Sequence, residues 1–129
     1  HPRVRRQRQM CIRDRFMLTL AMHPMGPSIF SVDSFDHALN PRLAKKMIQV
    51  FCEQIIQNNK HVFLTTHNPL VLDGLDLQND DIRLFAVDRD SNGYAQIRRI
   101  SVSQELIDEG LPLSRLWISG RLGGVPSLL

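Results

Sequence analysis

The most constraining feature of this sequence is a pair of short apolar runs on either side of one amphipathic segment. The runs span residues 28–33 and 61–66, and each is long enough for one buried strand. Between them, Asn40 and Pro41 form a helix start, since an N-cap side chain precedes a residue with a preset φ. A strand, a helix and a strand in this order predict a βαβ unit with parallel strands and a right-handed crossover.

The helix predicted from Pro41 to residue 57 carries its apolar side chains on one wide stripe. Two adjacent rows recur at three- and four-residue steps, one of Leu43, Met47, Val50, Phe51 and Ile55, the other of Ala44, Ile48, Cys52 and Ile56. Lysine, glutamine and glutamate side chains cover the opposite face. The stripe predicts that this helix packs against the two strands.

The remaining elements are predicted to be shorter. Residues 15–22 form a short apolar helix, and the prolines and glycine of residues 23–27 end it. Residues 70–75 form a short helix, residues 82–88 and 94–100 form two strands with hairpin-turn chemistry between them, and residues 103–109 and 113–121 form two helices. The predicted fold class is therefore α/β, a parallel βαβ core followed by a C-terminal β-hairpin and short helices.

Charge is unevenly spread along the chain. The formal net charge is +3, yet residues 1–15 carry six arginines and one acid, so the rest of the chain is mildly acidic. A basic arm of this kind suits nucleic acid, which is one functional interpretation. The string from Gln9 to Arg15 also resembles translated adapter sequence. We therefore interpret residues 1–14 as a disordered or non-native arm, and residues 15–129 as the C-terminal part of one domain.

Cysteine content and hydropathy limit where the chain works. The two cysteines, Cys11 and Cys52, are far apart and match no metal or redox spacing, so a reducing cytoplasm is the default expectation. The longest apolar runs fall far short of the ~20 residues that a membrane helix needs. We expect a cytoplasmic protein with no membrane partner.

Polar residues stand at the ends of both predicted strands. Asp33 and Ser34 close the first, and Thr65, Thr66 and His67 close the second. In open α/β sheets, ligands bind beyond the carboxyl ends of the parallel strands, so these side chains share one edge. An acid there can hold a metal-bound water and a histidine can donate to a phosphate oxygen, both of which nucleotide hydrolysis uses.

The order of these motifs resembles the ABC-type ATPases of the OLD-like group, related to RecF and SMC proteins and also called AAA-type ATPases. Their usual pattern is an apolar strand followed by Asp-Glu-Pro-Glu, then Leu-His-Pro, and later Thr-Thr-His-Ser-Pro. The counterparts here read Asp33-Ser34-Phe35-Asp36, Leu39-Asn40-Pro41 and Thr65-Thr66-His67-Asn68-Pro69. The resemblance covers roughly residues 15–126 and implies a partial P-loop NTPase fold, an ABC ATPase head.

The resemblance implies roles for single residues. Asp33 would be the Walker B acid on Mg²⁺, Asp36 would lie in the D-loop that joins two subunits around ATP, and His67 would be the switch histidine near the γ-phosphate. It also implies ATP and Mg²⁺ as cofactors, a homodimer formed through the ATPase head, and coupling to DNA-related or anti-phage defence activity. A nuclease partner or domain and DNA itself are among the implied partners.

Two departures from the family pattern limit this prediction. Ser34 occupies the position of the general-base Glu, and a hydroxyl cannot take a proton from water as a carboxylate does. Either another acid such as Asp36 serves, or the alternative holds, an ATP-dependent regulatory or dimerisation switch with little turnover. The sequence also contains no Gly-x-x-x-x-Gly-Lys-[Ser/Thr] loop. We therefore expect an ATPase in the intact protein, and weak or no activity from these residues alone.

A calcium-loop pattern in the hairpin turn is rejected. Residues 88–93 match its first half, but the twelfth position is Arg99 instead of a bidentate Glu, and strands flank the loop. A β-turn is the better interpretation.

Overall fold

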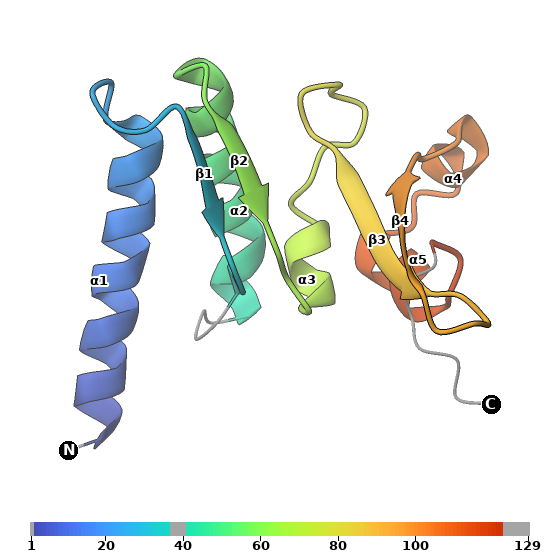
Figure 1. Cartoon of the computed structure of the whole chain (residues 1–129), viewed down its shortest axis with the longest axis horizontal. Coiled ribbons are helices and arrows are strands. Elements are labelled where there is room, and N and C mark those ends of the chain that lie inside the picture. Colours follow the sequence, from blue (N-terminus) through green and yellow to red (C-terminus); the bar gives the residue numbers. More distant parts are fainter. Residues whose placement is uncertain (1, 37–40, 123–129) are drawn as a thin grey trace. The chain divides into compact units, whose positions relative to one another are not determined.

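The computed structural model describes residues 2–36 and 41–122 (Figure 1). The chain divides into two compact units, residues 1–68 and residues 69–129, which are treated separately below. In the first unit, helix α1 spans Pro2–Met22, strand β1 Ile29–Val32, helix α2 Pro41–Gln57 and strand β2 His61–Leu64. Strands β1 and β2 pair in parallel, with Ile29 opposite His61 and Val32 opposite Leu64. The predicted α/β class and the βαβ unit are confirmed.

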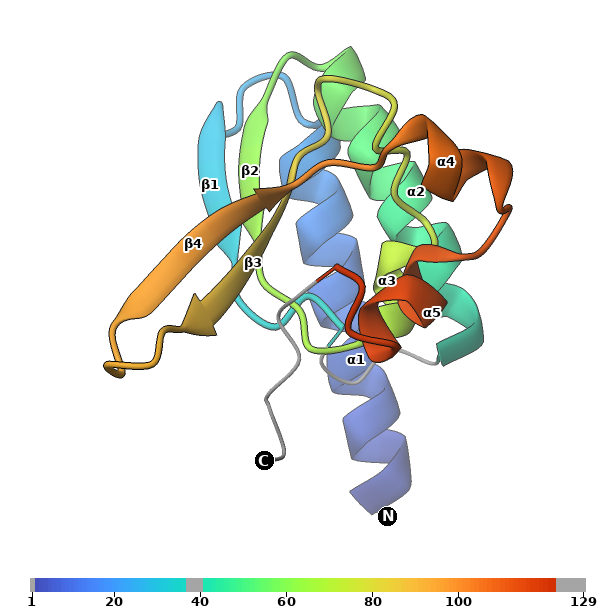
Figure 2. The ribbon, with the colours of Figure 1, turned by 90° about the vertical axis from the view of Figure 1, so that its right-hand side faces the viewer.

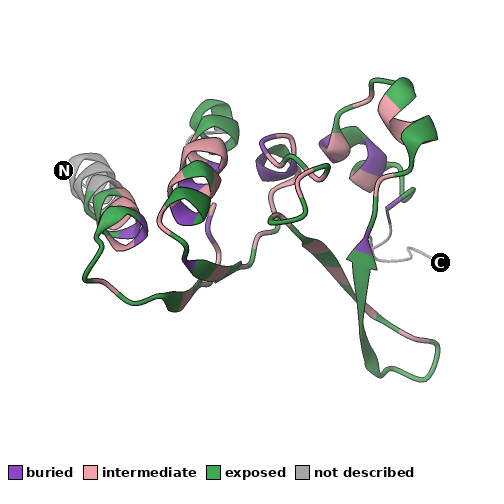
Figure 3. Cartoon of the chain, turned by 90° about the horizontal axis from the view of Figure 1, so that it is seen from above, coloured by how far each residue is buried: buried purple, intermediate pink, exposed green. Residues whose placement is uncertain are grey.

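Helices α1 and α2 cover the same face of the β1–β2 sheet (Figures 2 and 3). The buried residues of α2 are Ala44, Ile48, Phe51 and Ile55, which recur at three- and four-residue steps on one side of the helix. The Phe51 ring meets Phe30 of β1 edge-on, with ring centroids 6.3 Å apart, and lies 5.4 Å from the ring of Phe35. These aromatic contacts hold the helix against the strand.

The buried stripe of α2 is narrower than the sequence predicted. Leu43, at 55% exposure, and Ile56 lie at the borders of the predicted stripe and remain exposed. The two-stranded sheet and helix α1 cover only part of the surface of α2, so these outer apolar side chains stay exposed. The predicted helix start is kept at Pro41, while its cap residue Asn40 lies outside the described residues.

The expectation of fully buried strands is wrong for the described structure. Burial alternates along both strands: Phe30, Val32, Val62 and Leu64 are half-buried, whereas Ile29 is 63% and Phe63 is 70% exposed. The reason is that α1 and α2 cover one face, and the described part of this unit places nothing over the other (Figure 3). The exposed face of the sheet thus carries two large apolar side chains, Ile29 and Phe63, paired with His61 and Ser31.

Helix α1 begins at Pro2, well before the predicted start at Arg15. The stretch interpreted as a disordered or non-native arm is therefore helical here, and its non-native origin stays a prediction. None of the described helices combines the length and apolar character needed to cross a membrane.

The end of α1 is held by a buried lysine from the loop between α2 and β2. Lys60 is only 8% exposed, and its ammonium donates to the carbonyl oxygens of Leu20 at 2.5 Å and His23 at 2.7 Å. The last carbonyls of a helix have no partner within the helix, so this cation satisfies them and offsets the helix dipole.

We expect Lys60→Met to lower the free energy of unfolding by about 2–4 kcal/mol, because two carbonyl acceptors lose their buried donor. Urea denaturation of the chain followed by circular dichroism measures this change. Lys46→Met removes an exposed lysine on α2 and is the matched control, with an expected change below about 0.5 kcal/mol. Equal stability of the two variants would contradict the role of Lys60.

The second unit contains helix α3 (Pro69–Leu72), strands β3 (Leu84–Arg89) and β4 (Ala95–Ile100), and helices α4 (Gln104–Asp108) and α5 (Leu113–Ile118). Strands β3 and β4 form the predicted antiparallel hairpin. A hydrophobic core cluster of the second unit consists of Ile100, Leu116 and Leu122. The half-buried side chains packed against this cluster include Leu84, Ala86 and Leu106. Asp73 caps α5 from outside that helix, accepting from both the amide and the hydroxyl of Ser114 at 2.8 Å.

The hairpin turn is a β-turn, as predicted. The Asp90 carboxylate accepts from the amides of Asn92 and Tyr94, and Gly93 has a φ of 86° that the turn requires. Among the described residues, no group of three or more His, Cys, Asp or Glu side chains could hold a metal ion. The calcium interpretation therefore has no support in the described structure.

Candidate functional site

The polar residues that follow β1 and β2 lie side by side. Strand β1 ends at Val32 and β2 at Leu64, one or two residues earlier than predicted, so Asp33 and Thr65 begin the connecting turns. The Thr65 amide donates to the Val32 carbonyl at 3.1 Å, and the Phe35 amide donates to the Thr65 carbonyl at 2.9 Å. The chain after β1 therefore folds back around Thr65.

The hydroxyl of Thr65 joins two of the predicted site residues. It donates to one oxygen, Oδ1, of the Asp33 carboxylate and accepts from the Ser34 amide at 2.8 Å. The neighbouring hydroxyl of Thr66 donates to Oδ1 of Asp36 at 2.5 Å and accepts from the Asn68 amide at 3.1 Å. Each acid of the turn after β1 is thus held by one threonine at the end of β2.

Ser34 adopts a left-handed backbone, with a φ of 52°. For a residue with a Cβ, this conformation costs roughly 1–2 kcal/mol of free energy. The hydrogen bond from its amide to Thr65 and the one to its carbonyl from Arg13 hold the turn in place against that cost. The strained turn explains why β1 stops at Val32 and why the residue after Asp33 departs from the strand.

Arg13 is a contact that the sequence did not predict, because residues 1–14 were set aside. Its guanidinium donates to the carbonyl oxygens of Asp33 at 3.0 Å and Ser34 at 2.7 Å. The arginine-rich composition of residues 1–15 was the only sequence feature that could have indicated such a contact. Composition alone does not show which carbonyl oxygens an arginine contacts.

His67 lies two residues beyond Thr65, with an exposed side chain. Within the described part of the chain, its imidazole makes no hydrogen bond or ion pair. The structure therefore brings together Asp33, Ser34 and Asp36 through the two threonines. It places His67 next along the chain at the same end of β2, open to solvent and able to donate to a ligand.

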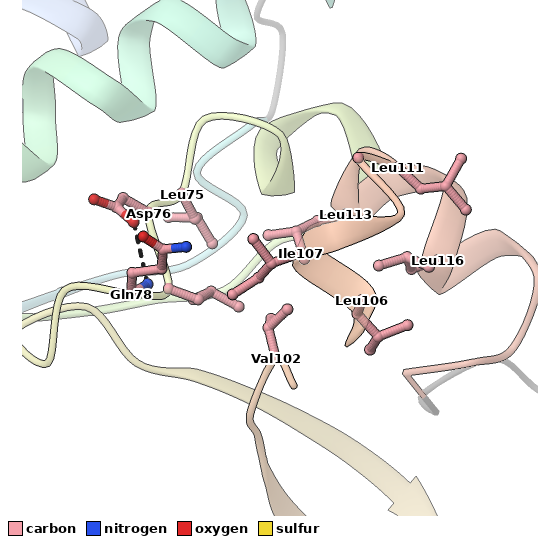
Figure 4. A pocket seen from close by; sticks show the side chains of 11 residues that line it. Leu75, Asp76, Gln78, Val102, Leu106, Ile107, Leu111, Leu113 and Leu116 are labelled. Atoms are coloured by element: carbon pink, nitrogen blue, oxygen red, sulfur yellow. Dashed lines mark hydrogen bonds between the residues drawn. The ribbon is translucent and has the colours of Figure 1, made fainter. Parts of the chain in front are cut away.

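Two other chemically distinctive features contain none of these residues. An open pocket of about 320 Å³ in the second unit is lined mainly by apolar side chains, among them Leu75, Leu106, Ile107 and Leu113, and contains none of the predicted site residues (Figure 4). Burial raises the pKa of the Cys52 thiol to about 11, with the neighbouring Glu53 carboxylate adding to the effect. Cys52 therefore stays protonated at neutral pH and does not supply a nucleophile.

The fold and this edge together define a class. The described unit has two parallel strands joined by a helix, with an acid after one strand and Thr-Thr-His after the next, at the edge where open α/β sheets bind ligands. Residues 14–73 match the family model of an AbiEii toxin-like AAA domain of type IV toxin–antitoxin systems. The match covers a little less than half of the chain and includes every predicted site residue. No curated protein matches the chain.

The matched segment is accordingly AAA- or P-loop ATPase-like, which is a nucleotide-binding, ATPase-type class. Proteins of this class bind nucleotide together with Mg²⁺. The residues present fit that ion only in part. Asp33 offers one exposed carboxylate, whose second oxygen accepts no hydrogen bond from any described residue. Mg²⁺ commonly takes one or two carboxylates and fills its remaining positions with waters and phosphate oxygens, so Asp33 suits a Mg²⁺–nucleotide complex and not a metal site built from protein alone.

Proposed function

We propose that this chain contributes the Mg²⁺-binding edge of an ATPase site, as the C-terminal half of an ABC- or AAA-type ATPase head. The observation that carries the proposal is the Asp33–Thr65 pairing at the ends of two parallel strands, within a segment that matches an AAA domain. The proposal requires a phosphate-binding loop, which these residues do not contain.

The side chains at this edge have distinct tasks in phosphoryl transfer. A bound Mg²⁺ neutralises charge that develops on the β- and γ-phosphate oxygens. The second carboxylate oxygen of Asp33 would hold that ion, directly or through a bound water. His67, exposed and unpaired with any described residue, would donate a hydrogen bond to the γ-phosphate. Asp36, held by Thr66, would stand at the contact with a second head.

The alternative function is an ATP-dependent regulatory or dimerisation switch with little turnover. Ser34 favours it, because the residue after the proposed Mg²⁺ acid carries a hydroxyl where a general base is needed. Asp36 is the nearest other acid in the turn, and the Thr66 hydroxyl occupies one of its oxygens. Both functions use the same nucleotide site and differ in the rate of hydrolysis.

The intact protein is proposed to act as a homodimer through the ATPase head. Its ATP cycle would drive or gate a DNA-related or anti-phage defence activity, with a nuclease partner or domain and DNA as the attached components. The support for this coupling is the motif resemblance, together with a matched family model that is named for a toxin–antitoxin system.

The proposed function is tested by His67→Ala in the ATPase that carries this segment together with a phosphate-binding loop. We expect hydrolysis to fall about 10²–10³-fold while ATP affinity changes only a few-fold, because the imidazole acts mainly on charge that grows in the transition state. Steady-state phosphate release and equilibrium nucleotide binding measure the two effects.

The matched control is His61→Ala, which removes an exposed histidine from the start of the same strand. It should leave hydrolysis unchanged. If the two histidine variants behave alike, His67 does not act on the phosphate and the proposal fails.

A further inference from the structure

Thr65 contacts each of the four consecutive residues from Val32 to Phe35. Its backbone amide donates to the Val32 carbonyl and its carbonyl accepts from the Phe35 amide. Its hydroxyl donates to the Asp33 carboxylate and accepts from the Ser34 amide. Thr65, the residue after β2, therefore contacts the turn at every position, and Arg13 adds bonds to the Asp33 and Ser34 carbonyls.

The two hydrogen bonds of the Thr65 hydroxyl depend on its side chain, and they differ in direction: one is donated and one is accepted. A threonine hydroxyl has one hydrogen to donate and can accept through its lone pairs, and both capacities are used here. Because the hydrogen goes to Oδ1 of Asp33, that oxygen is turned towards β2. The second oxygen accepts no hydrogen bond from a described residue, which leaves it available to a ligand. The carboxylate is therefore held in one orientation before any ion arrives.

We propose that Thr65 is a positioning residue, which orients the Asp33 carboxylate for a divalent cation and holds the left-handed turn at Ser34. This inference rests on the proposed function, because Asp33 is assigned there as the Mg²⁺ ligand. A side chain fixed by a neighbour loses less rotamer freedom when it binds, so the orientation raises the affinity for the ion.

The chain offers two matched variants. Thr65→Val keeps the branched shape and removes the hydroxyl, whereas Thr65→Ser keeps the hydroxyl. Thr66→Val removes the neighbouring hydroxyl, which holds Asp36 and not Asp33, and it serves as the control for losing a hydroxyl from this loop. Circular dichroism of each variant establishes that the fold persists.

The test uses nuclear magnetic resonance. The Asp33 rotamer and the Ser34 amide exchange are measured on the 129-residue chain, and Mn²⁺ is the paramagnetic probe for Mg²⁺ in the ATPase that carries this segment together with a phosphate-binding loop. In the wild-type chain, coupling constants should show one Asp33 rotamer. In the ATPase that carries this segment together with a phosphate-binding loop, Mn²⁺ with ATP should broaden the amides of residues 33–35 first. In Thr65→Val, we expect rotamer averaging at Asp33, about ten-fold faster hydrogen exchange at the Ser34 amide, and Mn²⁺ affinity about three- to ten-fold weaker. Thr65→Ser should restore all three values, and Thr66→Val should leave them unchanged.

The two readouts separate the inference from the function on which it rests. If Thr65→Val retains a single Asp33 rotamer and unchanged Ser34 exchange, Thr65 does not position the turn and the inference is overturned. If Mn²⁺ with ATP causes no broadening near Asp33 in the ATPase that carries this segment together with a phosphate-binding loop, the assignment of Asp33 as the ion's ligand is overturned. The rotamer and exchange data then still decide the role of Thr65.

Discussion

Asp33→Asn is expected to reduce Mg²⁺-dependent ATP hydrolysis by at least about 10³-fold, in the ATPase that carries this segment together with a phosphate-binding loop. Asparagine has nearly the same shape, so the oxygen that accepts from Thr65 can be kept. What is lost is the negative charge that attracts the ion to the exposed side of the carboxylate. Hydrolysis as a function of Mg²⁺ concentration measures the effect, and the variant should need far more Mg²⁺ to reach its small maximum.

The control for this substitution is Asp81→Asn, which removes the same charge from an exposed acid in the second unit. It should hydrolyse ATP at the wild-type rate. An Asp33→Asn variant with normal rate and normal Mg²⁺ dependence would show that another group holds the ion, and the proposed site would have to be abandoned.

Ser34→Glu is expected to raise ATP turnover by about 10²–10⁴-fold if the switch function is correct, because it places a general base next to the Mg²⁺ acid. If Asp36 or another carboxylate already serves as the base, the same substitution should give no gain. Single-turnover measurements of phosphate release from bound ATP distinguish the two functions directly.

Two further variants separate the chemistry of the new carboxylate from its effect on the turn. Ser34→Gln adds the same length without a base, so it should not raise turnover. Ser34→Gly relieves the positive φ of 52° and should stabilise the turn by about 0.4–1 kcal/mol, again without a gain in rate. A gain with glutamine equal to that with glutamate would show that packing and not proton transfer had changed.

The βαβ core was predictable because its signals are local and periodic. The apolar stripe of α2, the Asn-Pro helix start and the two apolar runs each follow from the spacing of side chains along the chain. The convergence of Asp33 with the end of β2 followed in turn, since parallel strands bring their carboxyl ends to one edge. The hairpin was predictable from its turn residues in the same way.

The contacts within the site were not predictable from the sequence. Thr65 and Thr66 were part of the recognised motif, but a threonine after a strand can point to either side, and only the paired register shows which acid each one meets. The left-handed backbone of Ser34 gave no signal, because serine is not a residue that marks a positive φ. The burial of Lys60 and its bonds to the end of α1 were also not predictable, because an isolated lysine in a loop is most often solvated.

The exposed sheet face of the first unit means that a molecule binding there would change the unit's stability. Any molecule or segment that covers Ile29 and Phe63 only when the strands are paired will bind the folded form and not the unfolded one. Such a ligand raises the free energy of unfolding by RT ln(1 + [L]/Kd), which is about 2.7 kcal/mol at a concentration one hundred times Kd. A molecule that covers this face would therefore raise the denaturation midpoint of the chain, as any other ligand of the folded form does.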